Sequence, residues 1–181
     1  SRGPSLVSYV GHGGAAVWAS ENVLNTWDAP SLPEQSRQPV LLTLNCLNGY
    51  FVAPNFDALT EALLKADGRG IVAGVSPSGL SLDAPAHAFH RALAGALASG
   101  AHDRLGDALL AGQKAYAETG AMPELLSVYH LFGEETRVVR WIRFVEEHLR
   151  KPDTLDVVLT LPESTSIEEP EVLGRMAQLS D

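Results

Sequence analysis

The chain has 181 residues, 45% of them hydrophobic, which suits one globular domain of ordinary size with a proper core. Its formal net charge of −9 and its lack of a basic cluster argue against binding to nucleic acids or anionic membranes. The single cysteine excludes an internal disulfide, and no apolar run approaches the ~20 residues of a membrane-spanning helix.

The first predicted element is a strand over residues 6–10, followed by His12 among glycines. We expect residues 11–14 to form a tight loop, because glycine can take positive φ. Prolines and other breakers in residues 15–38 predict irregular structure. Trp18 and Trp27 are expected to pack this segment down.

A second strand is predicted over residues 40–46, apolar but for Thr43, as in a strand buried on both faces. It ends in Cys46, and an Asn-Gly turn follows. A helix is expected over residues 56–66, with Asn55 as its N-cap and glycines ending it. Its predicted apolar face consists of Phe56, Leu59 and Leu63.

A third strand is predicted over residues 70–75, and residues 76–82, rich in Ser, Gly and Pro, predict a loop. Asp83 is then expected to cap a second helix that runs to about Ser99.

Further helices are predicted over residues 105–118 and 136–150, and strands over 125–132 and 155–161. From residue 162 onward the chain is an acidic tail. Strands that alternate with helices predict an α/β fold, with a mostly parallel sheet between layers of helices.

Two side chains suited to nucleophilic catalysis follow predicted strands. Neighbouring parallel strands would bring His12 and Cys46 to the same edge of the sheet, where open α/β folds place their sites. A thiol attacks carbonyl carbon as the thiolate, and a nearby imidazole can take its proton and later protonate the leaving amine. The backbone N–H groups of Gly13 and Cys46 are candidate donors to the oxyanion. The predicted chemistry is acyl transfer, with peptide hydrolysis as its default outcome.

The chain lacks an initiator Met, a signal-like segment and any acidic residue before His12. Because a catalytic histidine normally has an orienting acid, we expect a fragment or processed subunit, completed by an N-terminal part or a partner chain. Residues 1–150 would be the C-terminal portion of the catalytic domain. Residues 151–181 would add a strand and the acidic tail.

Several motifs resemble one known family. They are the Tyr-Val-Gly-His-Gly-Gly run at residues 9–14 with Trp18, the Asn-Cys-Leu-Asn-Gly-Tyr-Phe run at 45–51, Gly-Ile-Val-Ala at 70–73, and Tyr-His-Leu-Phe-Gly at 129–133. Together they look like the gingipain-type cysteine peptidases, family C25 of the caspase-like clan, over roughly residues 5–135. Tyr50 and the Glu-Glu pair after Gly133 depart from the family pattern.

The resemblance implies a caspase-like α/β/α sandwich that lacks its N-terminal strands, and a cysteine endopeptidase that acts through a thioester acyl-enzyme. His12 matches the catalytic histidine and Cys46 the nucleophile, with Gly13 and Cys46 as oxyanion donors. The substrate is a peptide or protein, and no cofactor or metal is implied for this chain. Family members are often secreted, although this chain carries no signal peptide.

The family's wall of the substrate side-chain pocket matches the loop from Ser76 to Asp83. The candidate substrate-binding residues are Ser76, Pro77, Leu82 and Asp83. Asp83 could supply an acidic pocket, although helix capping is its more ordinary role.

Two other functions stay open. A serine esterase would use Ser76 or Ser78 in a Gly-Xaa-Ser-Xaa-Gly elbow, but the second glycine is displaced here. A non-catalytic caspase-like module would only bind partners, since a fold alone does not establish activity.

Overall fold

The computed structural model describes residues 4, 6–133 and 158–160. The strands, in chain order, are β1 (Leu6–Val10), β2 (Gly13–Gly14), β3 (Val17–Trp18), β4 (Leu24–Asn25), β5 (Val40–Leu44), β6 (Ala73–Pro77), β7 (Tyr129–Gly133) and β8 (Val158–Thr160). The helices are α1 (Leu59–Lys65), α2 (Asp83–Ala98) and α3 (Leu105–Ala117), with short 3-10 helices η1 (Ala29–Ser31) and η2 (Pro123–Ser127).

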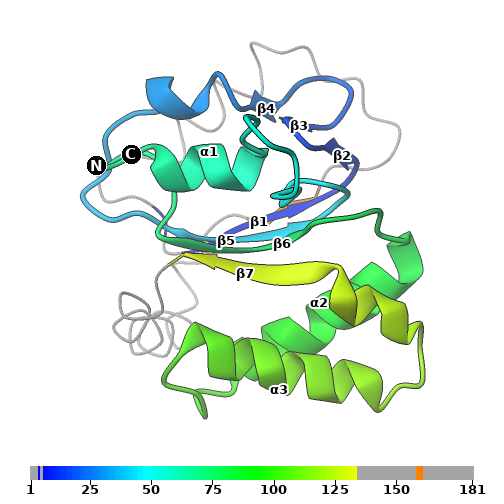
Figure 1. The fold of residues 1–181 in the computed structure, drawn as a ribbon. Coiled ribbons are helices and arrows are strands. Elements are labelled where there is room, and N and C mark those ends of the chain that lie inside the picture. The colour runs from blue at the N-terminus through cyan, green and yellow to red at the C-terminus, as the bar shows by residue number, and fades with distance from the viewer. Residues whose placement is uncertain (1–3, 5, 134–157, 161–181) are drawn as a thin grey trace.

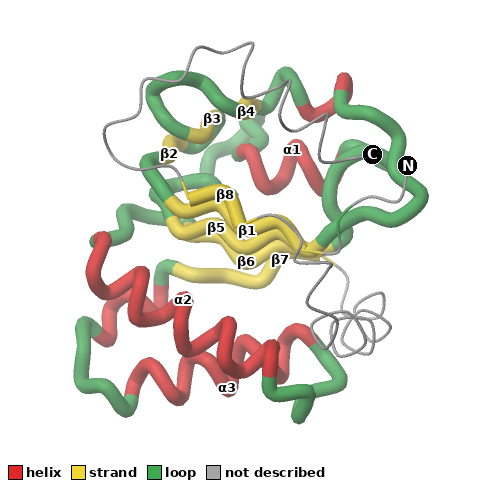
Figure 2. The backbone as a smooth tube through the Cα atoms, turned by 180° about the vertical axis from the view of Figure 1, so that it is seen from behind, coloured by secondary structure: helices red, strands yellow, loops and turns green. Residues whose placement is uncertain are grey.

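The central sheet has five strands in the order β7-β6-β5-β1-β8. Its pairs are parallel except that β7 runs antiparallel to β6. Figure 1 shows α1 and the small sheet β2-β3-β4 on one side of this sheet, and α2 and α3 on the other. Figure 2 shows the same layers from behind. The predicted α/β/α sandwich with a mostly parallel sheet is confirmed.

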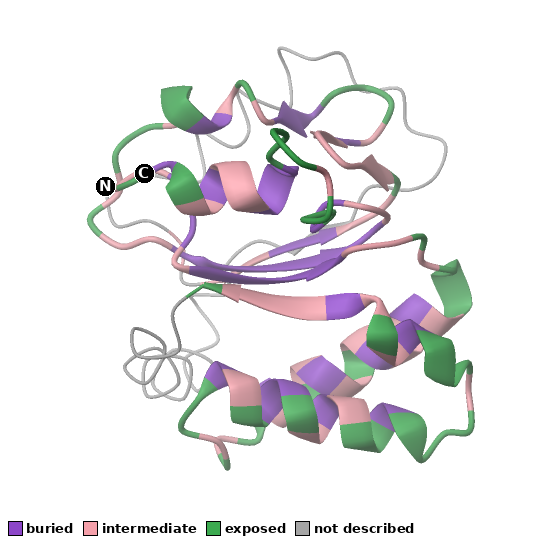
Figure 3. Ribbon diagram, in the orientation of Figure 1, coloured by how far each residue is buried: buried purple, intermediate pink, exposed green. Residues whose placement is uncertain are grey.

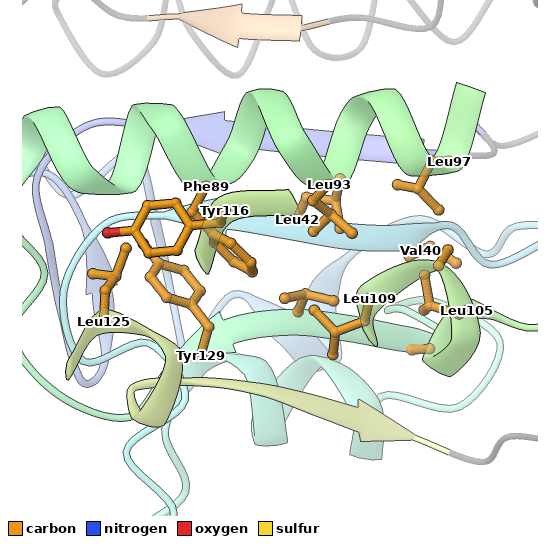
Figure 4. Packing of buried hydrophobic residues seen from close by; sticks show 13 residues of the cluster. Val40, Leu42, Phe89, Leu93, Leu97, Leu105, Leu109, Tyr116, Leu125 and Tyr129 are labelled. Atoms are coloured by element: carbon orange, nitrogen blue, oxygen red, sulfur yellow. The ribbon is translucent and has the colours of Figure 1, made fainter. Parts of the chain in front are cut away.

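The larger part of the core lies between the sheet and α2 and α3 (Figure 4). Strand β5 is buried along its whole length, and its Val40 and Leu42 lie in the same cluster as Phe89 and Leu93 of α2. Helix α3 lies so close to α2 that a Cβ on Gly112 would come 2.8 Å from the Cα of Leu93. Glycine is therefore required where the two helices cross.

A second apolar cluster lies on the other face, under α1 and the small sheet. Tyr9 of β1 stacks on Trp18 of β3, with ring centroids 4.4 Å apart and planes at 4°. Leu59 and Leu63 of α1 pack beside them and are almost fully buried. This packing holds the segment after β1 against the sheet.

The segment from residue 11 to residue 38 is more regular than predicted. It contains strands β2, β3 and β4, which form a three-stranded antiparallel sheet. Trp18 is buried as expected, but Trp27 is 79% exposed, so its predicted packing is wrong. The glycines at positions 11, 13 and 14 do not take positive φ.

The strand boundaries near the site also differ from the predictions. Strand β5 ends at Leu44, so Cys46 lies in the turn beyond it. Strand β6 begins at Ala73 rather than residue 70 and includes Ser76 and Pro77, which were predicted in a loop. Pairing of β6 with β5 extends only to Val75. Pro77 lies beyond the paired residues on that side, so the N–H that proline lacks is not needed for a hydrogen bond to β5.

The N-cap residues predicted for α1 and α2 are wrong. Helix α1 starts at Leu59 with Ala58 as its N-cap residue, and the backbone N–H of Ala58 donates to the Glu61 carboxylate at 3.0 Å. Asn55 has φ +59° and does not cap the helix, and Phe56 is 41% exposed. Helix α2 has Leu82 rather than Asp83 as its N-cap.

Helix α3 agrees with its prediction, and the segment at residues 125–132 divides between η2 and β7. Within the predicted strand at 155–161, β8 pairs in parallel with β1. The predicted helix at 136–150 and the tail from residue 162 lie outside the described residues. No helix in the described part of the chain is long and apolar enough to cross a membrane.

Candidate active site

Three loops meet at the carboxyl-terminal edge of the parallel strands. They follow β1, β5 and β6 at residues 11–14, 45–49 and 78–82. Strands β1 and β5 are adjacent and in register, with Val10 opposite Leu44. His12 and Cys46 each lie two residues beyond that pair, so the sheet brings both to one edge, where parallel α/β sheets place their sites.

Asn48 ties the loop after β5 to the segment after β1. Its side chain is fully buried, and Nδ2 donates to the carbonyls of Gly14 at 2.5 Å and Val17 at 3.2 Å. Its Oδ1 accepts from the side-chain amide of Asn45. A side-chain amide thus fixes the cysteine turn to the histidine loop.

The loop that carries His12 is also held by close packing. A Cβ on Gly13 would collide with the side chain of Asn45, which is itself buried. The hydroxyl of Tyr9 donates to the carbonyl of His12 at 2.7 Å. Burial, with a further contribution from Glu21, raises the pKa of Tyr9 to about 12, so this donor stays protonated.

The Cys46 thiol is half-buried and contacts the loop after β6. Sγ accepts from the N–H of Ser81 at 3.4 Å and donates to the Ser81 carbonyl at 3.6 Å. The next residue, Leu47, has φ +64°, a conformation that is unfavourable for a branched side chain. Its N–H bonds the Gly79 carbonyl at 3.1 Å, which helps to hold the turn in that conformation.

The His12 imidazole is exposed and makes no hydrogen bond within the part of the chain that the structure describes. The thiol and the imidazole therefore share an edge without a direct hydrogen bond between them. Catalytic hydrogen bonds are often long in ligand-free sites and tighten only when substrate binds.

The predicted substrate-binding residues separate into two groups. Ser76 and Pro77 are buried strand residues, so the structure does not offer their side chains to a substrate. Leu82 is 60% exposed. Asp83 is exposed as well, and its carboxylate faces His87 one turn along α2 at 3.2 Å.

The two serines of the esterase alternative are already bonded elsewhere. Ser76 is fully buried, and its Oγ bonds the hydroxyls of Thr43 at 2.9 Å and Thr60 at 2.7 Å. Ser78 Oγ lies 3.2 Å from the Val128 carbonyl oxygen and 2.9 Å from His130 Nε2, so its hydroxyl is already engaged by two partners within the fold.

A metal centre finds no support among residues 4, 6–133 and 158–160. These residues contain no group of three or more His, Cys, Asp or Glu side chains that could hold an ion. His87 and His90 share one face of α2, and Asp83 lies 3.2 Å from His87, but these three side chains do not converge as such a group.

Reasoning from the sequence did not single out Ser81 or Tyr129 as site residues, and it treated Asn48 only as part of a turn. Their roles depend on contacts between residues more than 30 positions apart. The one usable signal was the Asn-Gly pair after Cys46, which predicts a turn but not what the amide binds.

A mostly parallel sheet between helices, with a cysteine and a histidine after adjacent strands, defines an α/β protein with a candidate catalytic edge. Residues 1–136 match the model of peptidase family C25, and the chain therefore belongs to that family. The predicted family resemblance is confirmed.

The solved structures that resemble the chain share its fold. Gingipain R, described as an Arg-specific cysteine proteinase, aligns with a TM-score of 0.66 and 24% identity over 74% of this chain. The complex of Porphyromonas gingivalis RgpB pro- and mature domains aligns with a TM-score of 0.66 and 23% identity over 74% of this chain. A third structure, described as a protease, gives 0.63 and 14%, again over 74% of this chain.

The chain covers only 33%, 34% and 35% of those three chains, respectively. It thus spans about a third of their length. None of the curated proteins compared with it matches significantly.

Proposed function

We propose that this chain carries the nucleophile and the general base of a cysteine endopeptidase. The observation that supports the proposal best is the register of β1 and β5, which places His12 and Cys46 equally far beyond one paired position. Membership of family C25 supports the same chemistry. The substrate would be a peptide or protein.

In the proposed reaction, His12 takes the thiol proton of Cys46, and the sulfur attacks the carbonyl carbon of the scissile peptide bond. The backbone N–H groups of Gly13 and Cys46 would bind the oxyanion of the tetrahedral intermediate. The imidazolium then protonates the leaving amine, and a thioester forms. Water, deprotonated by His12, hydrolyses the thioester and releases the acid product and the free thiol.

The segment around Leu82 would lie along the bound peptide, because it flanks Ser81, which touches the thiol. We place Asp83 at the margin of this surface. Its carboxylate already pairs with His87. Among the described residues of this loop, no other carboxylate is therefore available to bind an arginine side chain, as an enzyme with the Arg specificity given for gingipain R would need.

The test is hydrolysis of a fluorescently labelled protein substrate by the full chain and by two variants. Cys46→Ala should abolish turnover while leaving the circular dichroism spectrum unchanged. His12→Ala should lower the rate by a factor on the order of 10² to 10⁴, the usual size of a lost acid–base group. Wild-type turnover in the Cys46→Ala variant would refute the nucleophile assignment.

A non-catalytic module is separated from a peptidase by thiol reactivity. If the dyad operates, iodoacetamide should modify Cys46 faster than it modifies glutathione at the same pH, and His12→Ala should remove that advantage. Reaction no faster than glutathione, together with absence of turnover, would favour the binding module.

A further inference from the structure

The Cys46 sulfur is held by the main chain of one residue on the loop between β6 and α2. The Ser81 N–H donates to Sγ at 3.4 Å, and the Ser81 carbonyl accepts the thiol proton at 3.6 Å. Both contacts come from the same residue. The place and orientation of Ser81 therefore decide where the sulfur lies.

Ser81 is in turn fixed by a side chain from another part of the fold. Its hydroxyl lies 2.9 Å from the hydroxyl of Tyr129, the first residue of β7. Tyr129 is only 3% exposed, and its ring lies 4.9 Å from that of Phe89 in the core that Figure 4 shows. Burial raises the pKa of Tyr129 to about 12, so its hydroxyl stays neutral wherever a thiol ionises.

We propose that Tyr129 and Ser81 form a positioning unit for the Cys46 thiolate, an inference that rests on the proposed peptidase function. The Tyr129 hydroxyl, anchored in the core, fixes the Ser81 side chain and so keeps the Ser81 N–H directed at Sγ. Neither residue touches the scissile bond. Both act through the sulfur.

The direction of the effect follows from the strengths of the two contacts. When the thiol ionises, the weak S–H bond to the Ser81 carbonyl is lost, and that oxygen then opposes the negative charge. The Ser81 N–H lies nearer to the sulfur, and its bond becomes charge-assisted and gains about twofold in strength. We therefore propose that the N–H contact outweighs the carbonyl, so that the unit holds the sulfur ready for attack as the thiolate.

Other hydrogen bonds hold the rest of this loop and do not involve Tyr129 or Ser81. The N–H of Ser78 bonds the Val128 carbonyl at 2.8 Å, and the Gly79 carbonyl accepts from Leu47. Removing the Tyr129 hydroxyl should therefore release Ser81 without unfolding the loop. The effect of such a variant on the thiol can then be measured in a folded protein.

Titratable and charged groups on the surrounding elements include His12 after β1, Tyr50 beyond the cysteine turn, Asp83, His87, His90 and Arg91 on α2, and Tyr129 and His130 on β7. His12 would also favour the thiolate, so the pH series must be repeated in the His12→Ala background. The contribution of Tyr129 should persist there.

The experiment measures the rate of Cys46 alkylation by iodoacetamide across a pH series, using the full chain. In Tyr129→Phe the rate at pH 7 should fall by about five- to tenfold, the effect of one lost hydrogen bond, and the rate–pH curve should move to higher pH. Ser81→Ala should do the same. The double variant should show no further loss, because both changes break one link.

Tyr116→Phe is the matched control. Tyr116 is buried in the same core, but its hydroxyl bonds the Met122 carbonyl at 2.9 Å instead of the loop. Its rate–pH curve should coincide with that of the wild type.

Coincidence of the Ser81→Ala curve with the wild-type curve would overturn the proposal, whether or not Tyr129→Phe folds. So would an equal shift in Tyr116→Phe, because the effect would then be general loosening of the core. Alkylation needs no turnover, so a protein that hydrolyses nothing but shows the expected shifts would refute the peptidase function and leave the positioning unit standing.

Discussion

Replacing Asn48 by alanine tests the link that holds the two halves of the site together. The change removes the donor to the Gly14 and Val17 carbonyls and the acceptor for Asn45. An unmade hydrogen bond at a buried group costs about 1–3 kcal/mol, and water can reach part of the two half-buried carbonyl residues. We therefore expect Asn48→Ala to lower the free energy of unfolding by about 2–4 kcal/mol.

Urea denaturation followed by tryptophan fluorescence measures this loss. A domain with an ordinary stability of roughly 5–15 kcal/mol would remain folded in the absence of urea. Under those conditions the variant should hydrolyse substrate at least about tenfold more slowly, because small displacements of catalytic groups are costly. Asn48→Asp should be worse at neutral pH, since it sets a carboxylate against two carbonyls, and it should recover partly as the pH falls.

The control is Asn25→Ala. Asn25 is also buried, but its side-chain oxygen accepts from the N–H groups of Trp27 and Asp28 at 2.8 and 3.1 Å, within its own turn. Its loss should cost a comparable free energy of unfolding without lowering the rate of the folded protein. The reasoning fails if Asn48→Ala loses less than about 1 kcal/mol, or if both variants lose activity alike.

Two further predictions concern the loop after β1 and helix α2. Gly13→Ala should lower the free energy of unfolding by about 1–3 kcal/mol, the usual cost of overpacking, because the added Cβ would collide with Asn45. At Gly14 the nearest atom would be 3.4 Å from such a Cβ, so Gly14→Ala should cost less. Equal losses in urea denaturation would contradict this. Burial above all lowers the pKa of His90 from its usual 6.5, so the unfolded chain binds the proton more readily, and stability should fall as the pH drops below 6.5 through the folded-state pKa. His90→Gln should reduce this loss of stability in melting curves recorded across that pH range, and His102→Gln should not. If stability falls equally with pH in His90→Gln and the wild type, His90 is not the group responsible.

The sequence was sufficient to predict the layout of the sheet near the site. Strands β1 and β5 are short, mostly apolar runs, of which β5 is buried along its whole length, and both were predicted almost within their bounds. Because the strands were expected to be parallel neighbours, the shared edge of His12 and Cys46 followed directly. The observed register, which the sequence did not predict, sets Val10 opposite Leu44 and so gives His12 and Cys46 the same distance along the chain from that pair.

The details that the sequence did not reveal depend on tertiary contacts. Pro77 suggested a loop, yet it lies in β6 because its missing N–H faces no partner strand there. Trp27 suggested packing, yet the turn made by Asn25 directs it to solvent. In both cases a local preference was correct on average and was overridden by what lies opposite the residue in the fold.

Buried polar residues of the sheet and of α1 explain why the site needs more than two catalytic side chains. Thr43, Thr60 and Ser76 bond one another through their hydroxyls, and the Thr60 N–H also bonds the Asn48 carbonyl at 3.0 Å. Burying such groups costs free energy unless each one is paired, so a network of this kind depends on the direction of every bond. Figure 3 shows the central sheet largely buried and the loops around it more exposed. Because this network bonds the backbone of the cysteine turn at Asn48, hydrogen-bond direction, which apolar packing does not supply, helps to hold these loops in one arrangement.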